Sequence, residues 1–167
     1  MIMIKTKSIA KCDCLRLIVG LFVFFQATAF MAQSQITIKN NLMYVDAAIF
    51  SSGLCSTIHE TIIDTGASVC IIDSTYAVDS CQIKGERLNA TMGNTMGKNI
   101  NTSYVYLDSI TFGGVVYTKV RCYLVDLAGT LQQFAPTFII GGEVLKKDLW
   151  CCDLKEYTLQ RYMRVPK

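Results

Sequence analysis

The sequence predicts an all-β protein with a single folded domain. Several segments alternate between apolar and polar residues with a period of two, and a two-glycine turn joins two of them. With 167 residues, of which 51% are hydrophobic and 17% are charged, the chain is long enough for one core and hardly for two. The same composition excludes a disordered chain and a chain that coats nucleic acid.

Residues 1–32 have the layout of a secretory signal. A basic start leads into nine consecutive apolar residues, Leu17–Phe25, and the small-residue exit Ala27-Thr28-Ala29 follows. An uncleaved anchor is the alternative, but this apolar segment is shorter than the roughly 20 residues that span a bilayer. We therefore expect an exported protein, secreted or periplasmic, with no stable membrane span after cleavage. Membrane anchoring by residues 1–32 remains the other possibility.

Loss of this segment would cancel the net charge of the chain. Of 16 Lys+Arg and 13 Asp+Glu residues, the segment holds four basic residues and one acidic residue, which leaves 12 of each sign. No basic patch then remains to indicate a nucleic-acid partner. The sequence has no glycine-rich phosphate loop and one histidine, His59, so we expect neither a cofactor nor a metal. A single histidine on a strand is more often structural than catalytic or metal-binding.

Six of the eight cysteines follow the signal segment, where export would permit disulfides. Their spacing shows no C-x-x-C zinc pattern, so buried thiols or one to two disulfides are the expected states, and the sequence does not choose a connectivity. Two of the six are adjacent and would point to opposite faces of a strand. The six are Cys55, Cys70, Cys81, Cys122, Cys151 and Cys152.

Residues 35–165 are predicted to form the folded domain. The alternation over residues 42–49 predicts a strand. Gly113-Gly114 separates Tyr104–Phe112 from Val115–Val125, which predicts a β-hairpin with a two-residue turn.

Two further elements are expected near the C-terminus. Asp153–Arg161 is predicted as another hairpin or a bent strand. Glu143–Trp150 follows Gly141-Gly142 and has the apolar spacing of one or two helical turns, which is too short to be stable without packing.

The candidate chemistry lies at Asp64, which stands between the apolar pairs Ile62-Ile63 and Ile71-Ile72. A buried carboxylate is costly unless it accepts hydrogen bonds, and Gly66 lets the backbone approach it with N–H donors. The hydroxyls of Thr65 and Ser68 can brace the turn. The pattern predicts a carboxylate held at the floor of a cleft. An ordinary surface turn is the alternative, although such a turn would not require apolar flanks.

The segment Ile62–Val69 resembles the active-site motif of the retropepsin-like (retroviral-type) aspartic proteases. Phe138–Leu145, with Ile140, Gly141 and Gly142 at its centre, is similar to the second signature of that family, an apolar triplet, a glycine and a short helix. The polar stretch Ala90–Gly97 falls where the family carries its flap hairpin, and a plain surface loop is the alternative. The candidate flap residues are Met92, Gly93, Asn94, Thr95, Met96 and Gly97.

This resemblance implies a closed β-barrel of the acid-protease type, one lobe with one short C-terminal helix. The family's mechanism needs two carboxylates that share one proton, and this chain has one Asp-Thr-Gly. The resemblance therefore implies a homodimeric aspartic endopeptidase in which Asp64 of each chain meets its copy on the twofold axis. Thr65 would brace the motif of the partner. Gly66, Ala67 and Ser68 would contact the backbone of a peptide substrate.

Two departures from the family pattern bear on these expectations. Glu143 stands where the family usually has Asp or Asn, which weakens the expected anchoring of the helix beneath the site. The terminal strands that build the family's dimer have no evident counterparts, apart from the candidate tail of residues 160–167.

Two other functions stay open at this stage. One is a non-catalytic peptide-binding or dimerisation module on the same fold, although such a module need not keep Asp64, Thr65 and Gly66 together. The other is a small exported all-β protein in which the turn at Asp64 is a coincidence.

Overall fold

The computed structural model describes residues 33–83, 86–93, 99–131 and 136–162, which all lie in one compact unit, Ala32–Lys167. The predicted signal segment of residues 1–32 lies outside the described residues. The same holds for Asn94, Thr95, Met96 and Gly97 of the predicted flap.

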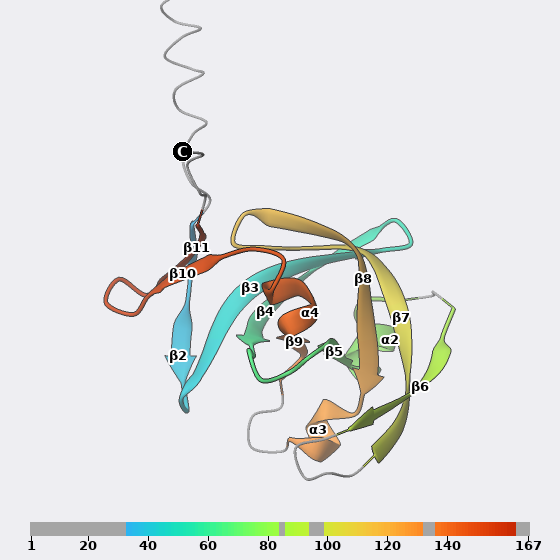
Figure 1. The fold of residues 1–167 in the computed structure, drawn as a ribbon. Coiled ribbons are helices and arrows are strands. Elements are labelled where there is room, and N and C mark those ends of the chain that lie inside the picture. The colour runs from blue at the N-terminus through green and yellow to red at the C-terminus, as the bar shows by residue number, and fades with distance from the viewer. Residues whose placement is uncertain (1–32, 84–85, 94–98, 132–135, 163–167) are drawn as a thin grey trace, which may run out of the picture. The chain divides into compact units, whose positions relative to one another are not determined.

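The described residues are mostly strands, with three short helices (Figure 1). The helices are α2 (Ser74–Asp79), α3 (Leu127–Thr130) and α4 (Gly142–Leu145). The strands are β1 (Gln33–Gln35), β2 (Thr37–Lys39), β3 (Leu42–Ser51), β4 (Leu54–Ile63), β5 (Cys70–Asp73), β6 (Leu88–Gly93), β7 (Asn99–Phe112), β8 (Val115–Val125), β9 (Phe138–Ile140), β10 (Trp150–Asp153) and β11 (Thr158–Arg161).

The main sheet closes into a barrel. Its strand order is β2-β3-β4-β9-β5-β8-β7-β6, and β3 also pairs with β7. This additional pairing joins β3, β4, β9, β5, β8 and β7 into a ring, while β6 extends from β7 beyond it (Figure 1). The predicted all-β fold with a closed barrel is confirmed.

The hairpin predicted around Gly113-Gly114 is present as β7 and β8. Phe112 pairs with Val115 across the turn, and Gly113 and Gly114 have φ values of 54° and 70°. Both central residues of a type I′ turn need positive φ, which glycine adopts without a steric penalty. The strand predicted over residues 42–49 is also present, extended to Ser51 as β3.

The barrel interior is filled by side chains that alternate along each strand. In β5, Cys70 and Ile72 point into the main core, whereas Ile71 belongs to a second apolar cluster. In β9, Phe138 and Ile140 point inward and Ile139 belongs to the second cluster. Both strands are thus apolar on both faces, as expected of central strands that are covered on both sides.

A second, three-stranded sheet joins the two ends of the domain in the order β1-β11-β10. β10 and β11 form the hairpin that Asp153–Arg161 predicts, with Asp153 paired to Thr158. The helix predicted over Glu143–Trp150 is longer than the observed one, because α4 ends at Leu145 and Trp150 begins β10. The indole of Trp150 stacks on Phe112 with ring centroids 4.8 Å apart, and this contact favours the strand.

Candidate active site

Asp64 immediately follows β4, at the centre of the barrel wall. β4 runs parallel to β9, with Ile62 paired to Ile139 and Ile63 paired to Ile140. The N–H of Asp64 continues this ladder and donates to the carbonyl of Ile140 at 3.0 Å. Two segments far apart in the sequence, the Asp64 motif and the second signature, therefore lie side by side.

The carboxylate of Asp64 is held from within its own turn. Its Oδ1 accepts a hydrogen bond of 2.8 Å from the N–H of Gly66. A Cβ at position 66 would lie 3.2 Å from the same oxygen, so any other residue there would require the carboxylate to shift by a few tenths of an ångström. Asp64 is half-buried as a residue, so it is not sealed from solvent.

The other residues of the motif face outward. Thr65, Gly66 and Ser68 are exposed and Ala67 is half-buried. Within the part of the chain that the structure describes, the hydroxyls of Thr65 and Ser68 make no hydrogen bond, so the expected bracing of the turn by these hydroxyls is not found. Backbone groups brace the turn instead.

The bracing comes from α4, which begins at the second signature. The N–H of Gly142 donates to the carbonyl of Ala67 at 2.7 Å, and the N–H of Glu143 donates to the carbonyl of Ser68 at 2.9 Å. The first N–H groups of a helix have no partner within the helix, and α4 has no side-chain cap. The Asp64 turn satisfies these donors and is fixed by them.

Gly141 allows the two segments to come this close. A Cβ at position 141 would lie 2.1 Å from the carbonyl oxygen of Val69 and 2.8 Å from that of Ala67. Glycine is therefore required here by close backbone approach, while its φ of −103° is ordinary.

Glu143 does not take part in this anchoring through its side chain. Its carboxylate Oε2 lies 3.4 Å from Nη2 of Arg121, in a half-buried ion pair. The guanidinium of Arg121 also lies 5.8 Å from the ring centroid of Tyr104 and 5.6 Å from that of Tyr123. The departure of Glu143 from the family pattern thus leaves the anchoring intact, because the backbone of α4 carries it.

Of the candidate flap residues, the structure describes Met92 and Gly93, which end strand β6. In β6, Met92 pairs with Ile100 of β7 and Gly93 pairs with Asn99. Met92 packs against the second apolar cluster, which also contacts Ala67 of the Asp64 motif. This cluster was not anticipated from the sequence, although the apolar runs in β5 and β9 signal burial on both faces. Its buried members are Tyr44, Ile62, Val125, Leu127 and Ile139.

A groove of about 440 Å³ opens beside the motif and is lined mainly by apolar side chains. We call it the Thr65 groove. Thr65 and Ile63 lie at one part of its wall, and Leu145, Trp150 and Leu159 contribute apolar side chains from α4 and the three-stranded sheet. The groove therefore connects the Asp64 motif to the terminal strands.

The remaining candidates of the sequence do not form a site. His59 is exposed, and its Nδ1 lies 3.2 Å from Oδ1 of Asp46. No group of three His, Cys, Asp or Glu side chains suited to a metal occurs in the described ranges.

The six cysteines are free thiols, of which Cys70, Cys81 and Cys122 are buried. Among residues 33–162, as far as they are described, no helix has the length and apolarity of a membrane span.

Comparison with known families identifies this arrangement. A family model described as "Aspartyl protease" matches residues 45–144, from β3 to α4. The chain belongs to the aspartyl protease family. The match includes both the Asp64 motif and Gly141-Gly142 of the second signature, the two segments that the structure brings together.

The fold agrees with this assignment. The structure resembles the crystal structure of a retropepsin-like aspartic protease from Rickettsia conorii, with a TM-score of 0.51 and 16% sequence identity over 78% of this chain and 90% of that chain. At this identity the likeness concerns the fold, which is retropepsin-like. A comparison with curated proteins gives no match.

Proposed function

We propose that this aspartyl protease family member is an endopeptidase whose catalytic pair consists of Asp64 from each of two identical chains. The observation that supports the proposal is the position of Asp64 on a turn fixed from both sides, by the N–H of Gly66 and by the N–H groups of α4. Such a turn holds one carboxylate oxygen in place and leaves the carboxylate open to a reactant.

The need for a second chain follows from the other aspartates. Asp73 is buried, and its carboxylate accepts hydrogen bonds from three backbone N–H groups. Asp148 contacts Tyr117 and Arg161, and Asp108 accepts from the N–H of Ser52. Each of these carboxylates has a structural role away from the turn, so a second copy of Asp64 is the natural partner.

The surface around the motif suits this assembly. Thr65 is exposed at the wall of the Thr65 groove, which runs from the motif towards the three-stranded terminal sheet. We propose that a second copy of the chain covers this groove, because two Asp64 residues can meet only if the surfaces next to both of them are in contact.

In the proposed reaction, the two Asp64 carboxylates share one proton, because two like charges this close do not both ionise. The ionised carboxylate accepts a proton from a water molecule, whose oxygen attacks the scissile carbonyl carbon. The protonated carboxyl transfers its proton to the carbonyl oxygen, which gives a gem-diol. The amine nitrogen then takes the proton that the first carboxylate accepted from water, the C–N bond breaks, and one hydroxyl of the diol returns its proton to the second carboxylate.

The proposed substrate is an extended peptide or protein segment, bound between the Asp64 motif and the β6–β7 hairpin. Met92 of the hairpin and Ala67 of the motif both pack against the second apolar cluster and are only partly buried, which suits apolar substrate side chains on either side of the cut.

The direct test is cleavage of a diverse peptide library by the purified protein between pH 4 and 7, compared with its Asp64→Asn variant. We expect cuts by the wild type that are lost in the variant, while sedimentation and thermal unfolding of the two proteins agree. The matched control is Asp46→Asn, which changes an exposed carboxylate away from the turn and should keep activity.

The alternative function is a non-catalytic peptide-binding or dimerisation module on the same fold. A wild-type sample that sediments as a dimer and cuts no peptide in the library would favour this module over the peptidase. Cuts that persist in Asp64→Asn would instead indicate a contaminating protease or a different catalytic group.

A further inference from the structure

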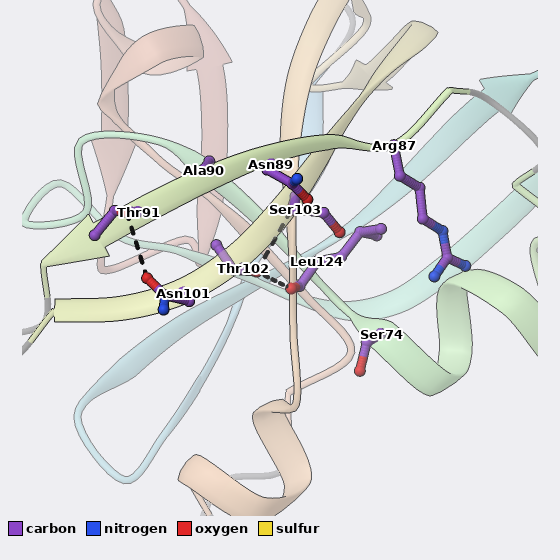
Figure 2. A pocket seen from close by; sticks show the side chains of 9 residues that line it. All are labelled: Ser74, Arg87, Asn89, Ala90, Thr91, Asn101, Thr102, Ser103 and Leu124. Carbon is purple, nitrogen blue, oxygen red and sulfur yellow. Dashed lines mark hydrogen bonds between the residues drawn. The ribbon is translucent and has the colours of Figure 1, made fainter.

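A polar cavity of about 820 Å³ lies against the β6–β7 hairpin, and none of residues 64–68 lines it (Figure 2). Its polar lining comes from β6, β7, the start of α2 and the segment before β6. The side chains concerned are Ser74, Arg87, Asn89, Thr91, Asn101 and Ser103. No carboxylate lines this cavity.

The polar side chains of the hairpin are placed there by strand register. Asn89 pairs with Ser103 and Thr91 pairs with Asn101, so these four residues share one face of the hairpin. Asn89, Thr91 and Asn101 are exposed, whereas Met92 lies on the opposite face and packs against the second apolar cluster. These four polar residues and Met92 therefore lie on opposite faces of the hairpin, although Ala90 and Thr102, on the Met92 face, also line the cavity.

Most of the hydrogen-bonding capacity of this face is unused. The hydroxyl of Thr91 lies 3.5 Å from Oδ1 of Asn101, at the limit of a hydrogen bond. Among the described residues, the amide groups of Asn89 and the hydroxyls of Ser74 and Ser103 make no side-chain hydrogen bond. Side-chain amides and hydroxyls both donate and accept, which matches the alternating N–H and C=O groups of a peptide backbone.

Arg87 gives the cavity its charge. It is exposed and has no carboxylate partner within the described ranges, whereas Lys39, Arg121 and Arg161 each pair with an acid. Figure 2 shows Arg87 beside Ser74 at one end of the cavity and the Thr91–Asn101 pair at the other end. A planar guanidinium with five N–H donors binds carboxylates in a bidentate manner.

We propose that this cavity binds an acidic segment of polypeptide, with an Asp or Glu carboxylate on Arg87 and the adjoining backbone along Asn89, Ser103 and the Thr91–Asn101 pair. The elongated arrangement of neutral hydrogen-bonding groups next to one cation favours a peptide over a small anion, which would use Arg87 alone. The site does not depend on Asp64, so it is present whether or not the protein is a peptidase.

The test is binding of a fluorescent hexapeptide that alternates Glu and Ser to the purified full chain, measured by anisotropy at 50 and 300 mM NaCl. The matched probe carries Gln in place of each Glu. We use Asp64→Asn as the background, so that cleavage of the probe does not interfere with the measurement. The variants are Arg87→Gln and, as the control for loss of one exposed cation, Lys155→Gln on the β10–β11 turn.

We expect the Glu peptide to bind and the Gln peptide to bind about tenfold more weakly or not at all, because the bond to a charged group is lost. Arg87→Gln should lower the affinity for the Glu peptide to that for the Gln peptide, whereas Lys155→Gln should leave the affinity for the Glu peptide unchanged. Raising NaCl to 300 mM should also lower the affinity for the Glu peptide. Equal binding of the two peptides, no binding of the Glu peptide, or equal losses in Arg87→Gln and Lys155→Gln would each overturn the proposal. Because Arg87 is exposed, its substitution should not affect folding, which circular dichroism of each variant checks.

Discussion

The carbonyl oxygen of Val69 faces Gly141 so closely that a Cβ on residue 141 would lie 2.1 Å from it. This contact links the strand that leaves the Asp64 turn to the residue that precedes α4. Backbone atoms on both sides of the contact are also held by hydrogen bonds, so a side chain at position 141 has no space into which it can move.

Gly141→Ala should therefore push α4 away from the Asp64 turn. We expect a loss of about 1–3 kcal/mol in the free energy of unfolding, as for other overpacking substitutions. Urea denaturation measures this loss. The matched control is Gly93→Ala in β6, where the nearest atom of the described residues to a Cβ is Oδ1 of Asn99 at 4.0 Å, and the change should be small. A fully stable Gly141→Ala protein would contradict the close approach.

Asp73→Ala should be costly because the carboxylate of Asp73 holds two segments. It accepts from the N–H groups of Thr75 and Tyr76 at the start of α2 and from the N–H of Leu127 before α3. We expect a loss of about 2–4 kcal/mol, since buried donors are left without partners. Asp153→Ala is the control, because Asp153 also accepts from two backbone N–H groups but is exposed. Equal losses in the two variants would contradict this account.

The stability of the protein should fall at high pH, in part through Cys70. Burial raises the pKa of the Cys70 thiol from 9.0 to about 11. The folded chain thus keeps this proton at pH values where the unfolded chain loses it, so the contribution is complete below pH 9 and is lost as the pH rises towards 11. Urea denaturation of the wild type and Cys70→Ala at several pH values should show a difference that shrinks over this range. A difference that does not change with pH would contradict the prediction.

Thr65→Val should weaken dimer formation while leaving the folding stability of the single chain nearly unchanged. Thr65 is exposed in the single chain, so the substitution should change the free energy of unfolding of a monomer by less than about 0.5 kcal/mol. If a second copy covers the Thr65 groove, the variant should dissociate at higher protein concentration than the wild type, as sedimentation measures. Thr57→Val, at an exposed position of β4, is the control. Identical dissociation of all three proteins would place the dimer contact elsewhere.

The parts of the fold that were predictable from the sequence depend on local patterns. The β7–β8 hairpin follows from two glycines between alternating strands, and the barrel follows from the resemblance of the Asp64 and Gly141 motifs to one family. The other two helices, α2 and α3, each carry a local signal at their start. Asp73 and Asp126 are helix N-caps, and aspartate is among the preferred residues at that position.

Other features depend on contacts between distant residues and could not be predicted from local patterns. The apolar spacing of Glu143–Trp150 suits a helix, yet Trp150 stacks on Phe112 and continues as a strand. The hydrogen bonds between α4 and the Asp64 turn join backbone N–H groups to backbone carbonyls. Because every residue has a backbone carbonyl, no particular residue type in the sequence indicates these bonds. The polar cavity beside Arg87 depends on the register of β6 and β7, which places Asn89 and Asn101 on one face of the hairpin.

The position of β9 between β4 and β5 limits which contacts can form while the chain is still being synthesised. β4 and β5 do not pair with each other in the strand order, so both lack a neighbour until Phe138–Ile140 has been synthesised. The Asp64 turn also gains its bracing only when Gly142 and Glu143 follow. A nascent chain that stops before this point would carry the aspartate without the geometry that positions it, and would expose two strand edges to aggregation. The Asp64 turn can therefore reach its braced geometry only after the chain up to Glu143 has been synthesised.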